Sequence, residues 1–276
     1  MTEKLQNTVA LITGAGQCIG REIALKLAGE GAAVFLNDLD ANALAGVIEE
    51  IAASGGSAGG LAGDITAEQF PDELVAAAIA AFGGLHIVVN NAGYIWNGAI
   101  HKHEDEQWDA MMDIHAKAPF RVLRAAGRYF RERVRAERAE GLVVCRKVVN
   151  ISSVSGLYGA ATQASYGAGK MAVIGLTNSL AKEWGALNIT VNAVAFGPIE
   201  TRLISEYEDT PHNVEIQGRK HKVGLSAELR ASVCEQAALG RFGTPQEAAG
   251  AVYLFCIPES DYITGQVLVC AGGAAL

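Results

Sequence analysis

Short apolar runs, rich in β-branched residues, recur along the chain between longer segments of a different periodicity. They lie at 9–12, 33–36, 86–89, 148–151, 189–194 and 266–270. Runs that are apolar at every position are typical of strands buried on both faces, as in a parallel sheet. The pattern therefore predicts six strands inside such a sheet.

The segments between these runs place apolar residues three and four positions apart, which is the spacing of one helix face. They lie at 21–30, 41–53, 71–82, 105–137, 165–184 and 245–255. Alternating strands and helices imply right-handed crossovers. We expect an α/β fold, a doubly wound parallel sheet flanked by helices on both faces.

No Pro- or Ser-rich linker, change of composition or internal repeat divides the 276 residues, so we expect a single domain over 1–276. One segment, 202–240, falls outside the alternation of strands and helices. It combines mixed charge with Pro211 and several glycines. These features predict a mobile helical flap over a substrate site at about 202–240.

The long predicted helix carries a row of arginines three and four residues apart, which places them on one helix face. They are Arg121, Arg124, Arg128, Arg131, Arg135 and Arg138. Such a face is either solvated or a binding stripe. Glutamates interleave with the arginines and the whole chain is acidic, which favours a solvated face.

The balance of charge excludes several classes of protein. Lys and Arg total 22 against 30 for Asp and Glu, giving a net charge of −8, which argues against a nucleic-acid partner. Half of the residues are apolar and 19% are charged, which excludes a disordered chain. The longest uncharged stretch, 148–169, is rich in Ser, Gly, Asn and Gln, so we expect no membrane span.

Cysteine usage indicates a reducing compartment. Five cysteines are scattered without a CxxC pair or zinc-type spacing: Cys18, Cys145, Cys234, Cys256 and Cys270. The first residues include Glu3 and Lys4 and only a short apolar run, unlike an export signal. We therefore expect a soluble, cytoplasmic protein with reduced thiols.

A glycine-rich turn, TGAGQCIG at 13–20, follows the first predicted strand and opens the first predicted helix. Backbone N–H groups and the helix dipole at such a turn can face a pyrophosphate. Asp38 ends the second strand, eighteen residues beyond Gly20. A carboxylate there can accept both hydroxyls of an adenosine ribose and repels a 2′-phosphate, which favours NAD. A solvated loop acid is the alternative.

Tyr166 and Lys170 are four residues apart at the start of a predicted helix, so they project from the same face. A phenol with a pKa of about 10 needs a nearby cation to act as an acid–base group near neutrality. Lys170 can supply that cation. A tyrosine and a lysine at this spacing often occur by chance, so the interpretation depends on where the pair lies in the chain.

Further motifs occur in the order and at the intervals typical of the short-chain dehydrogenase/reductase family, which the sequence resembles over essentially its whole length. They are TGAGQCIG at 13–20, Asp64 in GDIT, NNAG at 90–93, NISSVSG at 150–156, RFGTPQEAA at 241–249 and ITGQVLVCAGG at 263–273. Ser153 precedes Tyr166 by thirteen residues, as the family's catalytic serine precedes its tyrosine. The resemblance implies a Rossmann-type fold and NAD(P)-dependent oxidoreductase activity.

The resemblance also implies roles for individual residues. Tyr166 would donate a proton to a carbonyl or take it from an alcohol, Ser153 would bind the same oxygen, and Lys170 would bind the nicotinamide ribose and lower the pKa of Tyr166. The implied cofactor contacts are Gly14, Gln17, Cys18, Ile19, Gly20, Asp38, Asp64, Ile65, Asn91, Ala92, Gly93, Tyr166, Lys170, Gly197, Ile199 and Thr201.

Three positions depart from the family pattern. Cys18 stands where the family usually has a glycine, and a side chain there either crowds the pyrophosphate or points aside. His115 stands in place of the catalytic asparagine, where it either serves a proton path behind Lys170 or fills space at a bend of the helix. The sequence at 196–198, Phe-Gly-Pro, replaces the usual Pro-Gly.

Two histidines resemble metal ligands at first sight. His101 and His103 lie beside Glu104 and Asp105, in a polar loop at a predicted helix start. Acidic residues at a helix N-terminus need no metal to explain them, so we expect no metal site. His86 lies next to a strand and is interpreted as structural.

We therefore expect an NAD(H)-dependent oxidoreductase that interconverts a secondary alcohol and a ketone, with Tyr166 as acid and base. The alternatives are a 3-oxoacyl-thioester reductase and a catalytically silent dinucleotide-binding regulator. The family resemblance implies a homotetramer and a small-molecule substrate. Aromatic residues that wall an apolar pocket, or else pack in the core or flap, are Tyr94, Trp96, Tyr158 and Tyr207.

Overall fold

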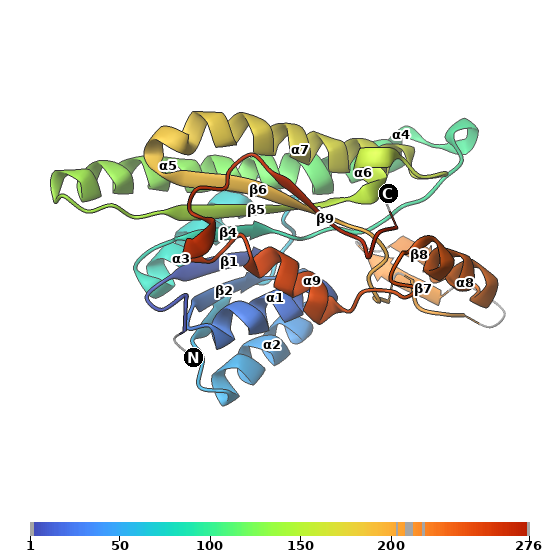
Figure 1. Cartoon of the computed structure of the whole chain (residues 1–276), viewed down its shortest axis with the longest axis horizontal. Helices are drawn as coiled ribbons and strands as arrows, with labels where there is room; N and C mark the ends of the chain where they lie inside the picture. The colour runs from blue at the N-terminus through green and yellow to red at the C-terminus, as the bar shows by residue number, and fades with distance from the viewer. Residues whose placement is uncertain (1–2, 203, 208–211, 217–218, 275–276) are drawn as a thin grey trace.

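Parallel strands form a seven-stranded sheet in the computed structural model, which describes residues 3–202, 204–207, 212–216 and 219–274. From edge to edge the strands are β3 (Ala58–Gly60), β2 (Ala33–Asn37), β1 (Val9–Thr13), β4 (Ile87–Asn90), β5 (Arg146–Ser153), β6 (Ile189–Phe196) and β9 (Val267–Cys270). Every neighbouring pair is parallel. The chain starts at β1, winds to one edge and then to the other, which confirms the doubly wound sheet (Figure 1).

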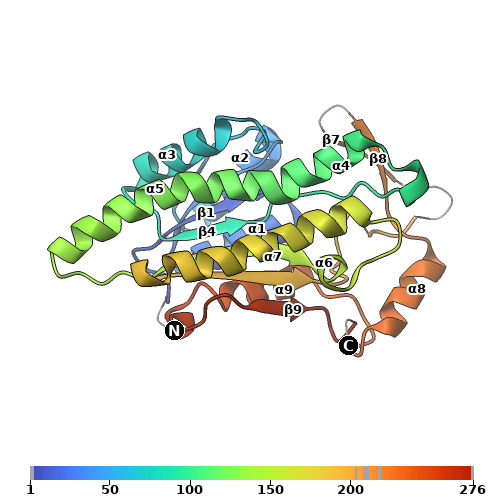
Figure 2. The same ribbon diagram turned by 90° about the horizontal axis from the view of Figure 1, so that it is seen from above.

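Helices cover both faces of the sheet, as expected. On one face lie α1 (Cys18–Gly29), α2 (Ala41–Ala53) and α9 (Pro245–Tyr253); on the other lie α3 (Phe70–Phe82), α4 (Asp105–Met112), α5 (Ala118–Ala139) and α7 (Ala164–Trp184). Figure 2 looks onto the face along which α5 and α7 run. Short helical turns lie between these elements: α6 (Val154–Tyr158), η1 (Ile100–Lys102), η3 (Gly185–Leu187) and η4 (Pro258–Ser260).

The sheet separates two hydrophobic cores. In β1, Ala10 and Ile12 face the core under α1, α2 and α9, whereas Leu11 faces the core under α3, α5 and α7. All three side chains are completely buried. Burial on both faces explains why the strands are apolar at every position rather than at alternate ones.

The helix expected over 105–137 is interrupted. A π-helical turn, η2 (Asp113–Lys117), separates α4 from α5 and contains His115. Pro119 follows in the first turn of α5, and it has no backbone N–H to bond the carbonyl of residue 115. The missing bond explains why the chain adopts a wider turn at this point.

The arginine face of α5 is a solvated face that makes ion pairs with its neighbours. Arg128 pairs with Asp72 of α3, and Arg131 with Glu183 of α7, each at 2.6 Å between side-chain nitrogen and oxygen. All four side chains are more than a third exposed, so each pair contributes at most about 1 kcal/mol.

The segment 202–240 is not wholly helical, contrary to expectation. It contains an antiparallel pair of strands, β7 (His212–Ile216) and β8 (Arg219–Val223), followed by α8 (Ala227–Gln236). Only the last four residues of β7, Asn-Val-Glu-Ile, alternate polar and apolar residues, and β8, Arg-Lys-His-Lys-Val, is polar up to its last residue. The segment therefore carries little of the period-two pattern that predicts strands. Pro211, one of the residues behind the flap prediction, lies outside the described residues. Within the described part of the chain, no helix is both long and apolar enough to cross a membrane.

Candidate active site

The glycine turn connects β1 to α1 at the carboxyl edge of the sheet. A Cβ on Gly20 would lie 1.9 Å from the carbonyl oxygen of Gly14, so the turn requires glycine there. Cys18 begins α1 with φ +47°, in the left-handed region that favours glycine. A non-glycine residue in this conformation costs on the order of 1 kcal/mol. Gln17 is the N-cap of α1, and Ile19 lies in its first turn.

The carboxylate of Asp38 lies directly against this turn. Its Oδ2 accepts a hydrogen bond from the Gly16 N–H at 2.8 Å, and its Oδ1 accepts one from the Asp40 N–H at 3.1 Å. The side chain is 8% exposed, so it is not the solvated loop acid considered as an alternative. The negative charge is fixed beside the backbone amides of the turn.

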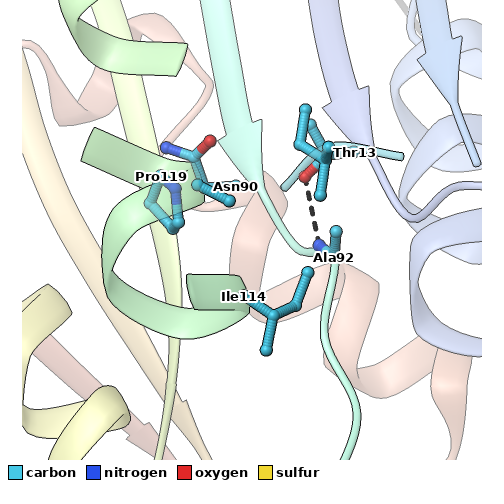
Figure 3. Close-up of a pocket in the computed structure, with 7 residues that line it drawn as sticks. Thr13, Asn90, Ala92, Ile114 and Pro119 are labelled. Carbon is cyan, nitrogen blue, oxygen red and sulfur yellow. Dashed lines mark hydrogen bonds between the residues drawn. The ribbon is translucent and has the colours of Figure 1, made fainter. Parts of the chain in front are cut away.

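The carboxyl ends of β1 and β4 are joined by hydrogen bonds. The backbone N–H groups of Asn91 and Ala92 donate to Thr13 Oγ1 at 3.0 and 3.1 Å, and Asn91 Nδ2 donates to the carbonyl of Gly14 at 2.9 Å. Figure 3 shows Thr13 and Ala92 at a small cavity between β1, β4 and the start of α5. The cavity has room for about one water, so it is too small for a substrate.

Two more predicted contacts lie beyond β3 at the same edge. Asp64 Oδ1 accepts hydrogen bonds from the backbone and hydroxyl of Thr66 at 2.8 and 2.7 Å. Ile65 is buried at 5% exposed. The Gly63 N–H donates to the Asp38 carbonyl at 3.0 Å, which ties this segment to the end of β2.

Ser153, Tyr166 and Lys170 come together at the end of β5. Ser153 is the last residue of β5, and its Oγ accepts a hydrogen bond from the Ser155 N–H at 3.1 Å. Lys170 Nζ donates to the carbonyl of Ile151 at 2.9 Å and lies 5.8 Å from the centre of the Tyr166 ring. The predicted constellation is thus assembled from one strand end and one helix face.

Burial changes the proton affinity of two of these groups. It raises the pKa of Tyr166, and a hydrogen bond with Ser153 opposes that rise. It lowers the pKa of Lys170 to about 7. The Tyr166 phenol is therefore protonated at neutral pH. A positive charge on Lys170 would lower the pKa of Tyr166 and so oppose the effect of burial on that group.

His115 lies behind Tyr166. Its Nε2 is 2.7 Å from the Tyr94 carbonyl oxygen, so Nε2 carries a proton and donates it. Burial, assisted by the charge of Lys170, holds the pKa of His115 well below its usual value, so the ring is neutral. Nδ1 is then a buried acceptor that has no partner among the described residues. Gly93 admits the ring, because a Cβ there would lie 2.5 Å from His115 Cε1.

The last predicted contacts follow β6. The Gly197 N–H donates to the Cys270 carbonyl at 3.0 Å, and Ile199 pairs with Gly243 in an isolated bridge. Thr201 lies two residues further along and is half-buried. All three lie beyond the carboxyl end of β6, on the same edge of the sheet as the residues above.

The structure also shows where other side chains that bear on the site lie. No cluster of three metal-ligating side chains occurs within the described ranges, and His103 is bonded to Ser165. Of the aromatic residues, Tyr94 is buried in the core, whereas Tyr158 is 63% exposed. Sequence reasoning missed Ser165, although its position directly before Tyr166 was a usable signal.

Comparison with known proteins identifies the family. Residues 14–275 match the family model described as enoyl-(acyl carrier protein) reductase. The chain is 32% identical to 3-oxoacyl-[acyl-carrier-protein] reductase FabG of Thermotoga maritima, covering 99% of this chain and 100% of that protein. It is also 32% identical to (2S)-[(R)-hydroxy(phenyl)methyl]succinyl-CoA dehydrogenase subunit BbsD of Thauera aromatica, covering 99% of this chain and 98% of that one.

Solved structures agree. A short-chain dehydrogenase/reductase from Serratia marcescens superposes with a TM-score of 0.83 at 26% identity, covering 99% of this chain and 100% of that one. A blue fluorescent protein from a metagenomic library, solved with NADPH, gives 0.82 at 26% identity and the same coverage. With its Rossmann-like sheet and these relatives, the chain belongs to the short-chain dehydrogenase/reductase family of oxidoreductases.

Proposed function

We propose that the protein is an NAD(H)-dependent oxidoreductase that interconverts a secondary alcohol and a ketone. The observation that carries the proposal is the convergence of Ser153, Tyr166 and Lys170 at the end of β5, on the edge of the sheet that also holds the glycine turn. Ligands of open α/β sheets bind at this carboxyl edge.

The turn fits a dinucleotide. The carbonyl of Gly14 packs so closely against Gly20 that no side chain fits there, and the turn is therefore tight. In a tight turn of this kind the backbone N–H groups at the N-terminus of α1 can face a pyrophosphate. Asp38 would hold the adenosine ribose, and Asp64 and Ile65 would contact the adenine. Residues beyond β4 and β6 would hold the nicotinamide half: Asn91, Ala92, Gly93, Gly197, Ile199 and Thr201. When bound, NAD(H) supplies or accepts the hydride.

The protein's own residues supply the proton. In the reductive direction Tyr166 donates its phenolic proton to the carbonyl oxygen, and the Ser153 hydroxyl donates a hydrogen bond to the same oxygen. The ammonium of Lys170 stabilises the tyrosinate that remains. In the oxidative direction the same tyrosinate takes the proton from the alcohol.

His115 is proposed as part of the path that returns this proton to solvent. Nε2 is occupied by the Tyr94 carbonyl, so Nδ1 is the acceptor that remains for a bridging water. The alternative is that His115 only packs the π-helical turn. The two roles differ, because a relay needs a polar group and packing needs only volume.

The segment 202–240 is proposed to cover the substrate. Arg230 of α8 is anchored beside β6, where its guanidinium donates to Glu200 at 2.9 Å and lies 4.5 Å from the centre of the Phe242 ring. This anchor places α8 next to the predicted nicotinamide contacts. Such a cover would exclude water during hydride transfer.

A homotetramer is proposed from two separate groups of exposed apolar side chains. Trp108, Phe120 and Met171 are 44, 46 and 51% exposed and belong to α4, α5 and α7. Val269, on edge strand β9, is 38% exposed, and Tyr262 is fully exposed nearby in sequence. Two self-complementary patches on one chain build a tetramer with dihedral symmetry. We place it in the cytoplasm, since its five cysteines are free thiols.

A 3-oxoacyl thioester is the second candidate substrate, because several relatives are named 3-oxoacyl-[acyl-carrier-protein] reductase. Against it, a net charge of −8 disfavours an acidic carrier protein. A silent regulator is disfavoured, because the catalytic constellation is intact.

The decisive experiment measures NAD⁺ reduction with cyclic, steroidal and sugar alcohols and with 3-hydroxybutyryl-CoA. The proposal expects the highest kcat/KM with a non-thioester alcohol, and Tyr166→Phe should abolish it. Preference for the CoA ester would establish the second candidate. Absence of NAD⁺ reduction with every compound of the panel would contradict the proposed oxidoreductase activity.

A further inference from the structure

His103 and Ser165 form a hydrogen-bonded pair beside the catalytic constellation. His103 lies on the segment after β4, just before the N-cap residue of α4, and its Nε2 is 2.8 Å from Ser165 Oγ. Ser165 is completely buried and directly precedes Tyr166 in α7. The proposed chemistry gives neither residue a role.

The turn of α7 that carries Tyr166 has no side-chain cap. Gln163 is the N-cap residue, and its side chain makes no hydrogen bond to the amides of the first turn. Helix ends without such a cap are less stable by about 1 kcal/mol. Ser165 instead bonds outward, to a side chain of a different segment. That bond restrains a turn that would otherwise fray.

The environment of His103 fixes its tautomer. Nδ1 is buried and has no hydrogen-bond partner in the described part of the chain. A buried N–H without an acceptor is the costlier of the two unpaired states. The proton therefore lies on Nε2, which donates to Ser165 Oγ.

A second bond joins the same two segments. The Gly98 N–H donates to the Thr162 carbonyl at 2.8 Å, four residues before Tyr166. A hydrogen bond within the segment also restrains it, because Gln107 Nε2 donates to the Asn97 carbonyl at 3.4 Å. The segment after β4 and the start of α7 are thus joined at the backbone and, through His103, at a side chain.

We infer that His103 is a positioning residue that holds the first turn of α7, and with it the Tyr166 phenol, against the segment after β4. The expected effect on kcat rests on the proposed role of Tyr166. The expected effect on the stability of the first turn of α7 does not depend on that role. The two consequences are therefore tested separately.

The structural consequence is measured by hydrogen exchange of the backbone amides of 167–170, the first hydrogen-bonded amides of α7. His103→Phe keeps a ring and loses the bond, and Ser165→Ala removes the acceptor. Each should raise exchange of these amides at least about tenfold, because the turn opens more often. His103→Gln keeps an N–H donor and should restore most of the protection. His101→Phe, at an exposed histidine two residues earlier, is the matched control and should change nothing.

The catalytic consequence is measured as NADH-dependent reduction of ethyl acetoacetate. We expect kcat to fall about tenfold in His103→Phe and in Ser165→Ala, while the KM for NADH stays within twofold, because a misplaced donor slows the chemical step. The double variant should be no slower than either single variant, because both remove the same bond.

The outcomes separate this inference from the proposed function. Unchanged exchange at 167–170 in both folded variants overturns the inference, whatever the activity. Raised exchange with wild-type kcat overturns its catalytic part. Wild-type activity in Tyr166→Phe would instead defeat the proposed function and leave the exchange result standing. Circular dichroism establishes that each variant is folded.

Discussion

The imidazole of His115 meets the phenol ring of Tyr166 edge to face, with the ring centres 5.0 Å apart and the planes at 89°. Such a contact stabilises aromatic pairs by about 0.5–1.5 kcal/mol beyond their burial. The arrangement restrains the Tyr166 ring from the side of the π-helical turn. It makes His115 the natural place to perturb the proton chemistry without removing the tyrosine.

His115→Asn should keep most activity, and His115→Leu should lower kcat about ten- to a hundredfold, if the residue serves the proton path. The reason is that Asn retains a polar group and Leu retains only volume. Steady-state rates from about pH 6 to pH 10 provide the measurement. Turnover of folded His115→Leu within twofold of wild type throughout would leave packing as the role of His115.

His115 should also make the fold sensitive to acid. Its pKa is held well below 6.5 in the folded protein, so the unfolded chain binds the proton more readily. The stability that His115 contributes is therefore fully present above pH 6.5 and is lost as the pH falls below it. His86, whose pKa burial also lowers, acts in the same direction. Thermal unfolding at pH 7.5 and 5.5 should show a smaller loss of Tm in His115→Asn than in wild type.

Tyr166 should govern the pH dependence in opposite senses for the two directions. Burial raises the pKa of its phenol, so the donor form persists to higher pH than usual. The reductive kcat should fall in two steps, first as Lys170 loses its proton near pH 7 and then as Tyr166 loses its own at a pH above the usual phenol range, whereas the oxidative kcat should rise with pH. Tyr166→Phe should lose at least about a hundredfold in both. An unchanged pH profile in that variant would point to another acid.

Asp38 should select NAD(H) over NADP(H) by at least about tenfold in kcat/KM, roughly 1.4 kcal/mol. Its carboxylate lies against the turn, where it would repel a 2′-phosphate. Asp38→Asn keeps an acceptor for the Gly16 N–H and removes the charge, so this variant should lose the preference with little loss of stability. Equal turnover of both cofactors by the wild type would contradict the prediction.

Cys18 should be shielded from alkylation by bound NAD⁺. Its backbone keeps the left-handed conformation at the start of α1, so a pyrophosphate held by the turn would cover the thiol. Mass mapping after iodoacetamide treatment, with and without saturating NAD⁺, gives the answer. Cys145, directly before β5 and at the other end of that strand from Ser153, serves as the internal control. Labelling of Cys18 that ignores demonstrably bound NAD⁺ would mean that the pyrophosphate lies elsewhere.

The proposed tetramer should dissociate when one of its two patches is made charged. Light scattering at micromolar concentration should give a tetramer for the wild type and a dimer for Met171→Glu, because the substitution affects only the patch on α4, α5 and α7. Met171→Leu is the matched control. A monomeric wild type at that concentration would end the proposal.

Much of the fold was predictable, because buried parallel strands and amphipathic helices leave strong periodic signals. β3 was missed, since its three residues, Ala-Gly-Gly, carry almost no hydrophobic signal. The π-helical turn was missed as well, because apolar spacing does not reveal one extra residue within a turn. The segment 202–240 was expected to be helical, because the mostly polar and charged residues of β7 and β8 carry little strand-like alternation.

The candidate site was predictable where the residues that act together lie close to one another in the sequence. Tyr166 and Lys170 are one helical turn apart, and the glycine turn is contiguous. The pair of His103 and Ser165 was not, since it joins residues 62 positions apart. A histidine beside two acids has the composition of a metal site, and only the folded chain shows its bond to a serine.

The π-helical turn at Asp113–Lys117 fixes the length of the chain between α4 and α5. The turn takes up one residue more than an α-helical turn does, so α5 keeps the rotation that it would have without that residue. The completely buried Val122 therefore faces the core, and the arginine face stays toward solvent. A deletion between Ala118 and Val122 has no such turn to absorb it, and it would rotate the rest of α5 by about 100°.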